Sequence, residues 1–135
     1  MGTLIDAVAL KRREAITAAT DVARNAAAQF CRGTENVECP SLSPDNRLIA
    51  FKKHVGPGAN GWRLAVLDVA TMAERVLSAE TRWVDDQVEW LDSAHVLYAV
   101  PRRTTSILDV WVAPVDGSAP ARVFLSQAES PIVVR

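Results

Sequence analysis

Few side chains in this sequence have the types and the spacing that catalysis or metal binding requires. The two histidines, His54 and His95, lie far apart, so a metal site would need carboxylates that folding brings beside them. There is no Gly-x-Ser-x-Gly element of a nucleophile elbow. Gly56, Gly58 and Gly61 match neither a phosphate-binding loop nor a dinucleotide fingerprint. We therefore expect no catalytic, metal-binding or cofactor-binding residues, and a protein that is not an enzyme.

One connecting segment carries the best candidates for contact with a partner. Trp83 lies in a predicted connection, outside the predicted strands, and Asp85 and Asp86 follow it closely. Neighbouring carboxylates on a loop can hold a cation or a basic partner. Ordinary solvated loop residues give the same pattern, so both interpretations stay open. We take Trp83, Asp85 and Asp86 as the candidate partner-contact residues.

The composition is that of one folded domain with nearly balanced charge. The chain has 135 residues, of which 49% are apolar and 23% are charged, a balance typical of globular proteins. The 15 basic and 16 acidic residues leave a formal net charge of −1, which predicts no nucleic-acid partner. No apolar run approaches the roughly 18 residues that span a bilayer, so we expect no membrane span.

The compartment and the cysteine chemistry stay open at this point. The basic cluster Lys11–Arg13 follows the first apolar residues instead of preceding them, so a secretory leader is not recognisable and the plain interpretation is a cytoplasmic chain. Cys31 and Cys39 are too few for a disulfide scaffold or a closed zinc site. They are near enough in sequence to bridge, and the count does not decide whether they pair.

The first part of the chain has a helical period. From Thr3 to about Arg32, apolar residues recur at spacings of three, four or seven, which places them on one stripe of a helix. Thr3 with Asp6 resembles a capping box, and Gly33 is a natural end. We expect residues 1–35 to form an N-terminal helical segment. A helix that covers an apolar face and a helix that binds a partner both fit this pattern.

From Val37 onward, short β-rich runs alternate with turn residues, as in an all-β meander. Ser43-Pro44-Asp45-Asn46 and Asp116-Gly117 have the residue types of tight turns. The runs predict nine strands: Glu38–Leu42, Leu48–Lys53, Trp62–Asp68, Arg75–Ser78, Gln87–Leu91, His95–Val100, Leu108–Ala113, Arg122–Leu125 and a closing Ile132–Val134.

The strands repeat. A shift of about 47 positions carries Ile49 onto Val96 and Phe51 onto Tyr98, with agreement in residue character more than in identity. A third copy begins at the end of the chain, where residues 130–133 are similar to residues 39–42. Four strands per unit at a period in the mid-forties is typical of β-propeller blades.

Residues 41–51, SLSPDNRLIAF, resemble the repeat element of the TolB-like β-propeller family. Asn46 stands where that family usually has glycine, and the second unit lacks the Ser-Pro pair. Residues 109–117 resemble the third strand and turn of such a blade, and residues 129–134 are similar to the closing strand of bacterial TolB-like proteins. The resemblance covers residues 36–135 and implies two four-stranded antiparallel blades and an extra terminal strand after the N-terminal α-helix.

What the resemblance implies about function is broad. Two blades do not close a ring, so we expect a longer propeller, self-association, or the N-terminal helix as a cover for one open face. The resemblance favours a non-catalytic module that binds a protein partner or assembles with itself. Two alternatives stay open: an accessory-domain fragment of a prolyl-oligopeptidase-like serine peptidase whose catalytic domain lies elsewhere, and a gene fragment with no independent role.

Overall fold

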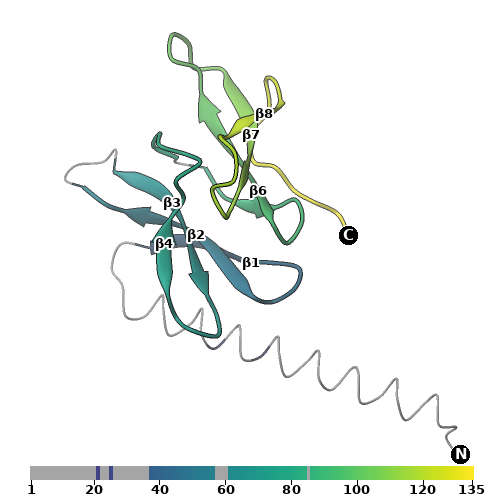
Figure 1. Ribbon diagram of the computed structural model, residues 1–135. Helices are drawn as coiled ribbons and strands as arrows, with labels where there is room; N and C mark the ends of the chain where they lie inside the picture. Colours follow the sequence, from purple (N-terminus) through teal and green to yellow (C-terminus); the bar gives the residue numbers. More distant parts are fainter. Residues whose placement is uncertain (1–20, 22–24, 26–36, 57–60, 85) are drawn as a thin grey trace, which may run out of the picture.

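A computed structural model describes residues 21, 25, 37–56, 61–84 and 86–135 of the chain. Over residues 37–135, the described part consists of strands, turns and irregular segments (Figure 1). The mainly β class predicted from the sequence is therefore confirmed. The helix predicted over Thr3–Arg32 lies outside the described residues, apart from the isolated positions Asp21 and Asn25.

Eight strands form two four-stranded antiparallel sheets, and in each sheet every strand pairs with the next one along the chain. This order is the one that the sequence predicts. The first sheet consists of β1 (Val37–Leu42), β2 (Leu48–His54), β3 (Trp62–Asp68) and β4 (Glu74–Val76), and the second sheet of β5 (Glu89–Trp90), β6 (His95–Pro101), β7 (Leu108–Pro114) and β8 (Arg122–Leu125).

Three strand predictions need correction. The strand predicted at Arg75–Ser78 is β4, at Glu74–Val76. The ninth strand predicted at Ile132–Val134 is not formed, because a strand needs a neighbour for its main-chain ladder and none of the described strands pairs with this segment. The strand predicted at Gln87–Leu91 is shorter, since β5 pairs with β6 only through Glu89 and Trp90. The N–H of Leu91 already belongs to the following turn, where it donates to the carbonyl of His95 at 3.0 Å.

Local chemistry explains how the first sheet turns. The hydroxyl of Ser43 is buried, accepts the N–H of Leu48 at 2.9 Å, and donates to the carboxylate of Asp45 at 2.7 Å. Asn46 has a φ of 61°, a conformation that asparagine tolerates better than most residues. The register of β1 shifts at a bulge between Glu38 and Ser41, and the exposed Cys39 within it is free, with a φ of 53°.

The main apolar core lies between the two sheets. From the first sheet, Ala50, Leu64 and Val66 pack against side chains of the second sheet that include Trp90 and Tyr98. All five are essentially inaccessible to water. Trp90 also crosses to the first sheet, since its indole N–H donates to the carbonyl of Ser41 at 2.8 Å.

The two sheets present equivalent faces in the same direction. In the first sheet the face toward the second sheet carries two cross-strand pairs, Ala50↔Val66 and Lys52↔Leu64. The pairs at the equivalent ladder positions of the second sheet are Leu97↔Val112 and Ala99↔Val110. These four residues form a separate buried cluster on the far side of the second sheet, which we call the outer face. The outer face of the second sheet is therefore equivalent to the face with which the first sheet packs against its neighbour.

A buried carboxylate fixes the connection between the sheets. Glu80 lies in the segment from β4 to β5 and is almost fully buried. Its carboxylate accepts the hydroxyl of Tyr98 at 2.6 Å and both Nε and Nη2 of Arg82, at 2.9 and 2.6 Å. The guanidinium of Arg82 also stacks on the ring of Trp111, 3.8 Å from its centroid. Because Tyr98 and Trp111 belong to the second sheet, this cluster anchors the connection to it.

The donors around Glu80 decide its ionisation. Burial opposes the charged form of the carboxyl, but the hydrogen bonds from Arg82 and Tyr98 outweigh it, so the pKa of Glu80 is lowered. Burial and the contact with Glu80 both raise the pKa of Tyr98. Glu80 is therefore a charged group in the interior, and it stabilises the fold only while its donors are present.

Replacing Arg82 by methionine should destabilise the protein, because the carboxylate of Glu80 then keeps only part of its donors. We expect Arg82→Met to lower the free energy of unfolding by about 1–3 kcal/mol. The matched control is Arg103→Met, since no described residue forms a hydrogen bond or ion pair with that exposed side chain. Urea unfolding followed by tryptophan fluorescence measures both variants, and equal stabilities would contradict the role assigned to Arg82.

Candidate partner-binding site

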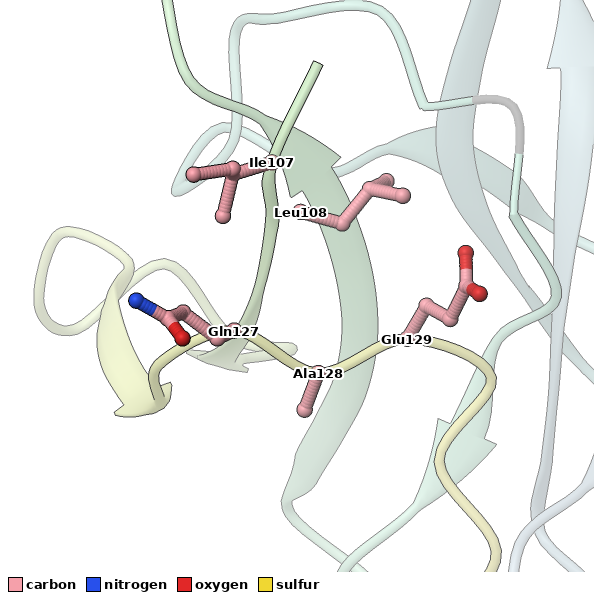
Figure 2. Close-up of a pocket in the computed structure, with 5 residues that line it drawn as sticks. All are labelled: Ile107, Leu108, Gln127, Ala128 and Glu129. Carbon is pink, nitrogen blue, oxygen red and sulfur yellow. The ribbon is translucent and has the colours of Figure 1, made fainter. Parts of the chain in front are cut away.

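Two adjoining cavities hollow the outer face of the second sheet. One has a volume of about 370 Å³ and the other about 230 Å³, and Leu108 and Glu129 line both. The other lining residues come from β6, the turn between β6 and β7, the segment before β5, and the chain after β8: Asp86, Ala99, Pro101, Ser106, Ile107, Gln127 and Ala128. Figure 2 shows the smaller cavity. We call the two cavities together the outer hollow.

The hollow forms because the C-terminal segment, residues 126–135, crosses the outer face instead of extending the sheet. The N–H of Ala128 donates to the carbonyl of Leu108 at 3.0 Å. Ala128 and Val133 pack against the buried cluster of the outer face. At the far end, the guanidinium of Arg135 bonds the carbonyl of Trp90 and lies 3.5 Å from the carboxylate of Glu89. The segment therefore runs from β8 to β5, and Figure 1 shows its yellow trace leaving β8 toward the C-terminus.

An ion pair fixes the start of this crossing. The carboxylate of Asp109 accepts Nε and Nη2 of Arg102, both at 2.9 Å, and the backbone N–H of Gln127, also at 2.9 Å. The hydrogen bonds from Arg102 and Gln127 lower the pKa of Asp109 to about 2. Asp109 thus links β7 to Gln127, the first residue of the C-terminal segment that lines the hollow.

Asp86 holds the middle of the crossing. Its carboxylate accepts the backbone N–H of Ser130 at 2.9 Å and the hydroxyl of Ser130 at 3.2 Å. The side-chain amide of Gln87 donates to the carbonyl of Pro131 at 3.4 Å. The carboxylate of Asp86 therefore binds the C-terminal segment at the edge of the hollow.

The structure separates the three candidate residues taken from the sequence. Trp83 is 58% exposed, as its place in a connection predicts, but it does not line the hollow. Asp86 lines the hollow, and Asp85 lies outside the described residues. Sequence reasoning missed Leu108 and Glu129, because they come together only when the C-terminal segment folds across the sheet.

The hollow combines an apolar floor with an acidic rim. Ala99, Pro101 and Leu108 supply the floor, and Glu129 stands at the edge. In Figure 2 the side chains of Leu108 and Glu129 extend to the same side, and the carboxylate of Glu129 lies beyond the methyl groups of Leu108. No described residue forms a hydrogen bond or an ion pair with this carboxylate. Such a surface can receive an aliphatic chain that ends in a donor or a cation.

The histidines do not join this site. His54, in β2, makes an edge contact with the ring of Trp62 at 5.1 Å between centroids. His95, in β6, lies with Nδ1 2.9 Å from the carboxylate of Asp92 in its own turn. Over residues 37–56, 61–84 and 86–135, no group of three or more histidine, cysteine, aspartate or glutamate side chains has a metal-binding arrangement.

A third cavity, of about 250 Å³, opens between the turns of the two sheets and is lined by charges of both signs. Its carboxylates already serve the chain: Asp68 accepts the N–H groups of Ala70 and Thr71, and Asp116 accepts that of Ser118. This crevice is therefore built mainly by turn chemistry, and the outer hollow is the better candidate for a binding site.

No known protein family and no curated protein matches this chain. In the described part of the chain, no helix has both the length and the apolar character needed to cross a bilayer.

The Asp109–Arg102 pair should make stability depend on acid pH. A carboxyl whose pKa is lower in the folded than in the unfolded state stabilises the fold above its unfolded pKa, and this contribution is lost as pH falls through the folded pKa. With a folded pKa of about 2, we expect the loss between about pH 4 and pH 2. Asp109→Asn should remove this part of the pH dependence.

Urea unfolding between neutral and strongly acid pH measures the effect. Arg102→Gln is the matched variant, since it removes the other partner and should flatten the same part of the curve. If the stability of either variant falls with acid as steeply as that of the natural chain, the ion pair does not contribute as described.

Proposed function

We propose that this chain is a non-catalytic protein-binding or assembly module that resembles the C-terminal part of a TolB-like β-propeller, and that it binds through the outer face of its second sheet. The order of the strands supports a propeller-like arrangement, since each sheet is a meander of four consecutive strands and the two sheets pack against each other. The resemblance of residues 41–51 supports the same interpretation.

The equivalence of the two sheet faces carries the proposal. Ala50, Leu64 and Val66 lie on a face of the first sheet that packs against the second sheet. Leu97 and Val112 occupy the corresponding face of the second sheet, and no other described sheet packs on it. The apolar side chains packed against this cluster are Leu91 and Leu108 beside it and Ala128 and Val133 of the C-terminal segment. The repeat places an equivalent packing face on both sheets. The face of the first sheet is covered by the second sheet, whereas the face of the second sheet is covered incompletely and is available to another polypeptide.

The second sheet and the C-terminal segment also expose large apolar side chains. Ile107 lines the hollow, and the others lie on β8 and in the C-terminal segment: Val123, Phe124, Leu125, Ile132 and Val134. Exposed apolar groups are typical of protein–protein contact surfaces. The partner is either a second copy of this chain, which makes the module an assembly unit, or a different protein.

Site-specific photo-crosslinking tests the proposal. A benzophenone amino acid replaces Ile107 at the rim of the hollow, and the matched control carries it at Val55, which has similar exposure but lies after β2 in the first sheet. In cells that produce the chain naturally, we expect a discrete crosslinked product from position 107 and none from position 55, because only the first position lies at the proposed face.

Mass spectrometry of the product separates the two modes. A product of two copies supports assembly, and a product with another chain supports partner binding. If position 107 gives no product, or only the smear that position 55 gives, the outer face is not a binding surface and the proposal is wrong.

A further inference from the structure

The outer hollow has a chemistry more specific than a general apolar face, and this chemistry indicates the group that fills it. We infer that the hollow receives a basic side chain, arginine or lysine, from the polypeptide that binds the outer face. The inference rests on the proposed function, because it names the group that the proposed surface recognises.

Shape and charge agree with such an occupant. The floor of Ala99, Pro101 and Leu108 offers contact to a chain of methylene groups. At the edge, the carboxylate of Glu129 is exposed and has no hydrogen-bond or ion-pair partner among the described residues. A carboxylate above an apolar floor favours a long side chain with a cationic end over a purely apolar one.

The contact between the two sheets also includes a carboxylate with a guanidinium donor. After β4, the connecting segment carries Glu80, which accepts a hydroxyl from Tyr98 of the sheet that packs there. The guanidinium of Arg82 also donates to the carboxylate of Glu80. After β8, the C-terminal segment carries Glu129, which has no such donor among the described residues. A partner on the outer face can supply this donor.

Asp86 is not the acceptor for this group. Both of its oxygens bond Ser130 and hold the C-terminal segment in place. Among the described residues that line the hollow, Glu129 is thus the carboxylate that is available to a partner. A change at Glu129 tests recognition, whereas a change at Asp86 would also release the segment that forms the hollow.

Binding of the N-butylguanidinium ion, a minimal arginine side chain, tests the inference on the full chain. In ¹H–¹⁵N correlation spectra we expect it to shift the amide signals of Leu108, Ala128 and Glu129, because these residues border the hollow. Neutral N-butylurea has nearly the same shape and should bind more weakly. Glu129→Gln should weaken the guanidinium about threefold and leave N-butylurea unchanged, as expected for the loss of one exposed ion pair.

The control variant is Asp116→Asn. It removes one negative charge from an exposed turn away from the hollow, and its amide oxygen can still accept the N–H of Ser118. If this variant weakens the guanidinium as much as Glu129→Gln does, the effect is one of net charge and the inference is wrong. Equal affinity for the ion and N-butylurea, or signal shifts elsewhere on the chain, would also overturn it.

This experiment and the crosslinking experiment fail independently. A crosslinked product from position 107, together with no guanidinium binding, leaves the outer face as a binding surface but removes the basic occupant. Guanidinium binding without a product at position 107 removes the proposed function, and with it a partner's side chain as the occupant of the hollow.

Discussion

A carboxylate that is shielded from water between packed elements needs donors from more than one of them, and Glu80 meets this requirement. Arg82, two positions along the chain, and Tyr98, from the second sheet, both donate to it. Breaking such a pair leaves a charge in the interior without compensation, which costs more than the pair itself contributes. The connection can therefore hold only one position on the second sheet. The surrounding apolar contacts supply most of the attraction, and the carboxylate selects the geometry in which they form.

The fixed orientation of the two sheets also determines which face of the second sheet points outward. Because both sheets point the same way, the face that carries Leu97 and Val112 matches the packing face of the first sheet and turns outward. The C-terminal segment crosses this face but packs on it through small or single side chains, chiefly Ala128 and Val133. It hides the most buried positions and leaves a hollow beside Leu108. The candidate site thus exists because the C-terminal segment covers the outer face incompletely.

The sequence predicts the strands well wherever local chemistry decides them. The continuous apolar runs of β2 and β6 and the turn at Ser43 define their limits to within one residue. Predictions fail where tertiary contacts decide: Ile132–Val134 has β-branched residues but no neighbouring strand, and Glu80 is a charged residue in a connection, which gives no sign of burial. For the site, the exposure of Trp83 follows from its place in a connection. The meeting of Leu108 with Glu129 does not, because no local pattern records where the last residues cross a sheet.

The bulge at Cys39 has a consequence for how copies of this chain can meet. β1 is an outer strand of its sheet, and its main chain is interrupted there by the bulge and by Pro40, which has no N–H to offer. The outer strand of the second sheet, β8, is only four residues long and pairs with β7 through a second irregularity. A regular intermolecular ladder of the amyloid kind needs long and flat templates. Pairing of folded copies through the edges β1 and β8 is therefore disfavoured, although apolar surface is exposed nearby.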